Sequence, residues 1–142
     1  FLEKLHETIK AIKQVYTGPI TRLALCSTFL FNMDLKALHD SYIKTTQNKD
    51  EYPVEWQLRK VLRSELGADN KITINNVSTI SRSIAQIETK ASADVVILDI
   101  DINTLVGTDV NLIKNLESDF WQYSADKIQK EQEYYSTLLA NE

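Results

Sequence analysis

Cysteine, histidine and glycine are scarce in this sequence, and their scarcity excludes several kinds of functional site. One cysteine and two histidines cannot form a recognisable zinc site or an internal disulfide. Three isolated glycines exclude the glycine-rich loops that bind phosphates. We expect Cys26 to be buried rather than nucleophilic, because lone cysteines are among the most buried residues. A single cysteine also slightly favours a reducing, cytoplasmic compartment.

Long apolar runs and a basic surface are missing as well. No apolar stretch approaches the length of a membrane span, and no signal-peptide pattern is visible. The net charge is −4, with 16 basic residues scattered among 20 acidic ones. A nucleic-acid-binding protein normally has a basic face, so we expect no nucleic-acid partner. The sequence starts at Phe1 rather than methionine, and we expect it to be a piece of a longer chain.

The 142 residues are enough for one domain, and the hydrophobic pattern predicts alternating helices and strands. We expect helices at 1–17, from Asp34, at 53–66, at 78–90 and from Asp109 onward, strands at 20–26, 71–76 and 95–102, and a loop at 44–50. The helix at 53–66 has the strongest support, with Pro53 in its first turn and Gly67 as its C-terminal cap.

Strands separated by helices predict a parallel sheet. We therefore expect an α/β domain over residues 1–142, with a small three-layer, Rossmann-like or flavodoxin-like sheet flanked by helices. The alternative is an α+β fold in which residues 71–103 form an antiparallel hairpin. In a parallel sheet, a ligand would bind outside the carboxyl ends of the strands.

Asp99 and Asp101 are two residues apart on a predicted strand. Their side chains should project from the same face, with Cα atoms about 6.5 Å apart. Paired carboxylates can bind Mg²⁺ or Mn²⁺, which prefer oxygen ligands. The alternative interpretation is that the strand has run past its covering helices and these carboxylates simply meet water.

Several short motifs follow one another along residues 20–117. They are residues 23–28 (LALCST), Tyr52-Pro53, residues 74–78 (INNVS) and residues 94–104 (DVVILDIDINT). In order and spacing, this series resembles the Gly-Asp-Ser (GDSL or SGNH) esterase superfamily. The resemblance implies a parallel α/β fold, with Ser27 or Thr28 as the nucleophile and Asn103 as the retained asparagine of the Gly-x-Asn-Asp block. Val77 stands in place of the oxyanion-hole glycine.

The family's terminal Asp-x-x-His block has no match, because the last histidine in the chain is His39. A serine hydroxyl needs a positioned base, so we do not expect these residues to form an active esterase. The sequence predicts a non-catalytic binding or structural module. The alternative is a fragment of an esterase whose histidine lies outside the chain.

Aromatic residues gather near the C-terminus, at Phe120, Trp121, Tyr123, Tyr134 and Tyr135. We expect them to cover the sheet. A protein-docking or self-association surface on the C-terminal helix is the alternative.

Overall fold

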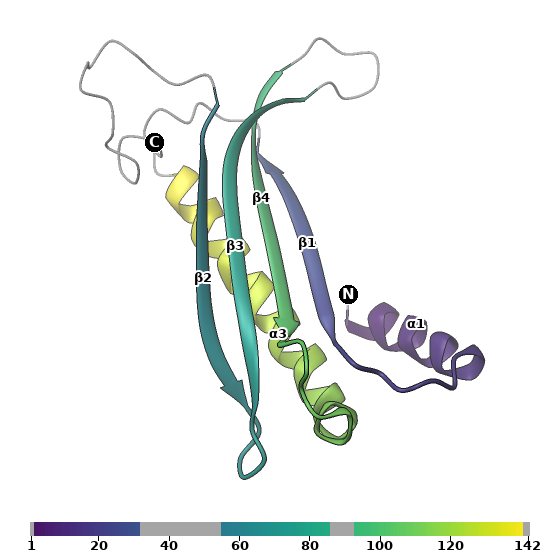
Figure 1. Cartoon of the computed structure of the whole chain (residues 1–142). Helices are drawn as coiled ribbons and strands as arrows, with labels where there is room; N and C mark the ends of the chain where they lie inside the picture. The colour runs from purple at the N-terminus through teal and green to yellow at the C-terminus, as the bar shows by residue number, and fades with distance from the viewer. Residues whose placement is uncertain (1, 32–54, 86–92, 141–142) are drawn as a thin grey trace.

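The structure, a computed structural model, describes residues 2–31, 55–85 and 93–140. Its elements are α1 (Leu2–Val15), β1 (Ala24–Phe31), β2 (Gln57–Leu66), β3 (Ile72–Ala85), β4 (Ala93–Thr104) and α3 (Val110–Ala140). The strands form a four-stranded sheet in the order β1-β4-β3-β2, and every neighbouring pair is antiparallel. Figure 1 shows α3 crossing one face of this sheet along its length.

The prediction of a parallel, Rossmann-like or flavodoxin-like sheet in three layers is therefore wrong. The domain is an α+β fold whose sheet carries α3 on one face. The alternative of an antiparallel hairpin within residues 71–103 describes the structure better, because β3 pairs with β4 in antiparallel register. No common rim of parallel strand ends exists among the described residues, so the ligand site expected there has no structural basis.

Two predicted helices are strands. The segment 53–66, predicted as a helix, contains β2, and β3 continues through most of the segment predicted as a helix at 78–90. The helix predicted at 1–17 and the helical C-terminal region are confirmed as α1 and α3. The helix from Asp34, the loop at 44–50 and Tyr52-Pro53 lie outside the described residues.

Spacing explains the error in β2. Leu58, Leu62 and Leu66 are four residues apart, and four is close to one helical turn but is also two full periods of a strand. In the structure these leucines share the face of the sheet that carries α3, and Leu58 and Leu66 pack against the core. Arg59 and Arg63 between them point to the other face. Gly67 has a φ of 102° and lies in the turn between β2 and β3, not at a helix end.

The core lies between α3 and the inner face of the sheet, which we define as the face toward α3. The buried residues of α3 follow one another at intervals of three or four, the spacing of one helix face: Ile113, Glu117, Phe120, Ser124, Ile128, Glu131 and Tyr135. They meet alternate residues of the central strands, namely Ile72, Ile74 and Ile80 of β3 and Val96, Leu98, Ile100 and Ile102 of β4. The C-terminal aromatic residues Phe120 and Tyr135 thus cover the sheet, as predicted.

Helix α1 is attached more loosely. None of its residues is buried, and Lys13 Nζ forms an ion pair of 2.6 Å with Glu117 Oε2 of α3. In Figure 1, α1 lies past the β1 side of the sheet. No described helix is both long enough and apolar enough to cross a membrane.

Candidate functional site: the free edge of β1 and its groove

The residues predicted as nucleophiles lie on opposite faces of the sheet. Ser27 is paired with Ile100 and points to the inner face, whereas Thr28 is paired with Asp99 and points to the outer face, away from α3. Asn103 also lies on the outer face, where Asn75 Nδ2 donates a hydrogen bond of 3.2 Å to its Oδ1. The antiparallel sheet therefore does not gather Ser27, Thr28 and Asn103 around one point.

Asp99 and Asp101 both lie on the outer face, and each is paired with a residue of β1. Thr28 Oγ1 donates a hydrogen bond of 2.6 Å to Asp99 Oδ1, and Cys26 Sγ donates one of 3.5 Å to Asp101 Oδ1. Within the described ranges, no three histidine, cysteine, aspartate or glutamate side chains form a group that could hold a metal ion. A magnesium or manganese site at Asp99 and Asp101 stays a prediction.

Cys26 is exposed, so the expectation of a buried cysteine is wrong. Its thiol pKa is nevertheless raised, chiefly because the sulfur loses part of its hydration at the sheet surface. The Asp101 carboxylate raises this pKa further, through its charge and through the hydrogen bond, while the positive charge of Arg22 opposes the change. A raised pKa reduces the thiolate fraction at neutral pH and makes Cys26 a weak nucleophile.

Among residues 2–31, 55–85 and 93–140, β1 has a partner strand on one side only. Thr104 N donates to Leu23 O over 3.0 Å, which fixes which residues of β1 face β4. In an antiparallel ladder the paired residues alternate along the strand. The backbone groups that hydrogen-bond to β4 are therefore those of Leu25, Ser27, Phe29 and Phe31. The N–H and C=O groups that point to the outside of the sheet are those of Ala24, Cys26, Thr28 and Leu30.

The two edges of the sheet differ in charge. The β1 sequence, ALCSTFLF, contains no charged residue, proline or glycine. The β2 sequence, QLRKVLRSEL, carries Arg59, Lys60, Arg63 and Glu65. Charged side chains and proline are the usual means by which proteins prevent further strands from pairing with an edge. The β2 edge has such charges, whereas the β1 edge is open to an added strand.

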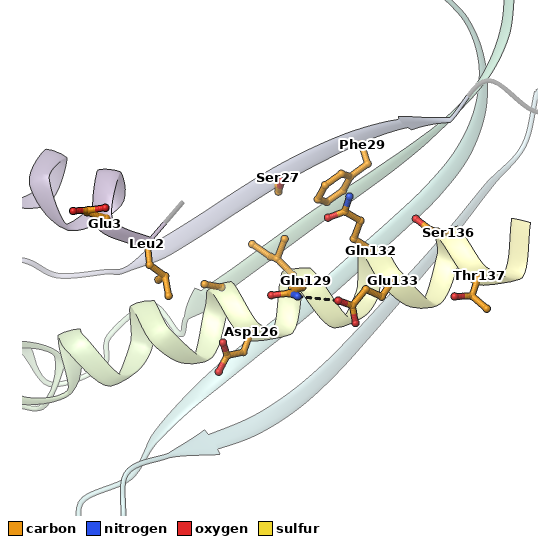
Figure 2. A pocket seen from close by; sticks show the side chains of 12 residues that line it. Leu2, Glu3, Ser27, Phe29, Asp126, Gln129, Gln132, Glu133, Ser136 and Thr137 are labelled. Carbon is orange, nitrogen blue, oxygen red and sulfur yellow. Dashed lines mark hydrogen bonds between the residues drawn. The ribbon is translucent and has the colours of Figure 1, made fainter. Parts of the chain in front are cut away.

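A groove runs beside this open edge, between β1, α3 and the start of α1, and Figure 2 shows the side chains around it. Its volume is about 910 Å³. Ser27 and Phe29 come from the inner face of β1, Leu2 and Glu3 come from α1, and α3 supplies Ala125, Asp126, Ile128, Gln129, Gln132, Glu133, Ser136 and Thr137. The α3 residues form one flank of the helix, next to the flank that packs on the sheet.

A buried polar cluster holds α3 on the opposite side, over β2 and β3. Glu131 is 9% exposed and accepts from Lys60 Nζ and Ser78 Oγ, each at 3.3 Å. Tyr123 donates its hydroxyl hydrogen to Asn76 Oδ1 over 3.0 Å. Because these side chains satisfy one another, we assign them to the positioning of α3 rather than to a ligand.

The groove was not predicted from the sequence. The predicted strand ended at residue 26, so Phe29 was not recognised as a residue of the edge strand. The alternation of Leu25, Ser27, Phe29 and Phe31 is the signal that could have extended the strand. Nothing local in the sequence shows that β1 would be an edge, because strand order depends on the whole fold.

Comparison with known proteins gives no relative on which to base a function. No protein-family model matches the chain, and no curated protein is significantly similar to it.

Proposed function

We propose that this domain is a non-catalytic binding module that takes up an extended segment of another protein as an added strand along β1. The outward N–H and C=O groups of Ala24, Cys26, Thr28 and Leu30 on an uncharged edge are the observation that carries this proposal. A partner backbone would extend the sheet by hydrogen bonds between backbone N–H and C=O groups, as in the pairs that already join its strands.

The groove explains how such a segment would be recognised. Side chains of an added strand alternate between the two faces of the sheet. Those on the inner side would enter the groove beside Ser27 and Phe29. Those on the outer side would lie next to Cys26, Thr28 and Leu30, and Leu30 is 55% exposed. Backbone hydrogen bonds would provide affinity, and the groove would select among side chains.

The esterase alternative implies a sheet that differs from the observed one. It depended on parallel strands whose ends bring a nucleophile and Asn103 together, and the observed sheet is antiparallel. Of the two histidines, only His6 lies among the described residues, on α1, where it lines a shallow pocket together with Lys114 and Trp121. Thr28 is engaged by Asp99, and Ser27 points into the groove on the opposite face.

The test uses a random peptide library displayed on phage, selected on the whole protein. The deciding variant is Thr28→Pro, which removes an outward N–H and adds a ring at the edge, a position where proline is tolerated in sheets. We expect the selected peptides to bind this variant about tenfold more weakly. Thr28→Ala is the matched control, because it also loses the hydrogen bond to Asp99 but keeps the N–H, and it should bind normally.

Hydrogen exchange gives a second measurement that does not depend on the variant. Selected peptides should slow the exchange of the amides of Cys26, Thr28 and Leu30 in the unmodified protein, because these amides would then donate to the peptide backbone. Peptides that bind the proline variant equally well, and that leave these amides unprotected, would show that β1 is not the binding edge.

A further inference from the structure

We infer that the segment taken up at β1 is basic, with lysine or arginine at the alternate positions that face the groove. This inference rests on the proposed strand addition and specifies its partner. The described residues that line the groove include three acidic ones, Glu3, Asp126 and Glu133, and no lysine or arginine.

The carboxylates of the groove are not neutralised by cations within the described part of the chain. Asp126 Oδ1 accepts a hydrogen bond of 2.9 Å from Gln122 Nε2, and Glu133 Oε1 accepts one of 2.8 Å from Gln129 Nε2. Both donors are neutral amides, so the charges remain available to a ligand. The nearby Glu117 and Glu131 are different, because Lys13, Lys60 and Lys127 pair with them.

The apolar part of the groove suits the same side chains. Leu2, Phe29 and Ile128 lie beside the acidic residues, so the lining combines apolar carbon with negative charge. Lysine and arginine side chains are complementary to such a lining. Their aliphatic stem packs on apolar surface, and their cationic end stays near water, where it can meet a carboxylate. An acidic side chain at these positions would meet like charge.

A second copy of this chain fits the groove less well. Two copies paired through β1 would present ALCSTFLF to each other, and this segment has no cation to place beside Glu3, Asp126 or Glu133. Each copy also has a net charge of −4, which opposes close approach at low ionic strength. A basic segment of another protein supplies the missing cations, and its charge is attracted to the acidic domain rather than repelled by it.

The library selection described above also tests the charge of the partner. We expect the selected peptides to carry lysine or arginine at every second position, with apolar or β-branched residues between them. Asp126→Asn/Glu133→Gln should weaken their binding about fivefold, since each exposed ion pair contributes modestly. Asp69→Asn/Asp119→Asn removes the same charge from exposed residues outside the groove and should leave binding unchanged. Raising the salt concentration should reduce the affinity for the parent protein more than for the groove variant.

The possible outcomes separate the two proposals. Peptides that lose binding with Thr28→Pro but are neutral or acidic would overturn the basic partner while leaving strand addition intact. If Asp126→Asn/Glu133→Gln and its control Asp69→Asn/Asp119→Asn weaken binding equally, the basic partner is likewise overturned and strand addition is left intact. Peptides that are basic but indifferent to Thr28→Pro would overturn both. A concentration-dependent dimer that excludes the peptides and is abolished by Thr28→Pro would identify a second copy as the occupant and overturn the basic segment.

Discussion

The reactivity of Cys26 illustrates how a single neighbour sets the chemistry of a side chain. The carboxylate of Asp101 accepts a hydrogen bond from the thiol and raises its pKa, second only to the loss of hydration. The thiolate is the reactive form, so Asp101 lowers the reactive fraction at any pH below the thiol pKa. The edge of β1 therefore carries an exposed cysteine whose reactive thiolate fraction is lowered by its neighbour.

Replacing Asp101 should increase the reactivity of the Cys26 thiol. In Asp101→Asn the negative charge is gone, the pKa of Cys26 falls, and alkylation by iodoacetamide at pH 8 should become roughly two- to fivefold faster. The rate is measured by mass spectrometry of the intact protein. Asp99→Asn is the control, because Asp99 makes the smallest contribution to the shift. An equal acceleration in both variants would show that the hydrogen bond to Asp101 has no special role.

The sequence predicted part of this local arrangement. The spacing of Asp99 and Asp101 correctly placed them on one face of a strand, because side chains alternate in any strand, parallel or antiparallel. It could not predict that Thr28 and Cys26 would lie opposite them, since that pairing joins segments about 70 residues apart. Contacts of this kind depend on strand order and register, which local patterns do not contain.

At the scale of the element, the turn between β2 and β3 sets the register of both strands. Gly67 lies there with a φ of 102°, a conformation that residues with a Cβ rarely adopt. A Cβ added at this position would come within 2.5 Å of the backbone oxygen of Asn70. Both the dihedral angle and the space therefore require glycine.

We expect Gly67→Ala to lower the free energy of unfolding by about 2 kcal/mol or more, measured by urea denaturation. Gly107→Ala is the matched control: its φ of 85° is also positive, but an added Cβ would meet no atom within 4 Å. The control should lose only the cost of the dihedral angle, about 1 kcal/mol. Equal losses in the two variants would mean that the contact with Asn70 relaxes freely.

The helices that were predicted correctly and the strands that were mistaken for helices differ in the spacing of their apolar residues. Helices α1 and α3 were found because their apolar residues follow intervals of three and four, which no strand reproduces. In β2, Leu58, Leu62 and Leu66 fit both a helical turn and a period of two, whereas Val61 fits only the helical spacing. Four good helix formers, Gln57, Arg59, Lys60 and Glu65, strengthen the helical pattern. Pairing with β3 overrode that local preference. In β3, the content of isoleucine, valine and threonine favours a strand over a helix.

At the scale of the whole molecule, α3 and the sheet share one hydrophobic core, and we expect them to unfold together. Phe120 lies in the middle of the helix and is fully buried, in the same cluster as Ile74, Leu98 and Ile102 of the central strands. Its ring also packs edge-to-face on Trp121, with centroids 5.0 Å apart. Loss of this side chain would therefore affect both layers together.

Phe120→Ala should reduce the free energy of unfolding by about 3–5 kcal/mol, because it leaves a cavity between the helix and the sheet. Urea denaturation followed by both circular dichroism and tryptophan fluorescence should show one shifted transition. The neighbouring Asp119→Ala, at an exposed position, should change stability by no more than about 0.5 kcal/mol. Two separate transitions in the Phe120 variant would show that the layers unfold independently.

The difference in charge between the outermost strands also bears on stoichiometry. A segment that binds at β1 leaves the β2 edge unchanged. Its charged residues Arg59, Lys60 and Arg63 still disfavour the pairing of a further strand. Under the proposed strand addition, each domain would take up one segment, and the β2 edge would not pair with a segment bound to another domain. The same asymmetry favours discrete complexes of defined size over fibrous polymers.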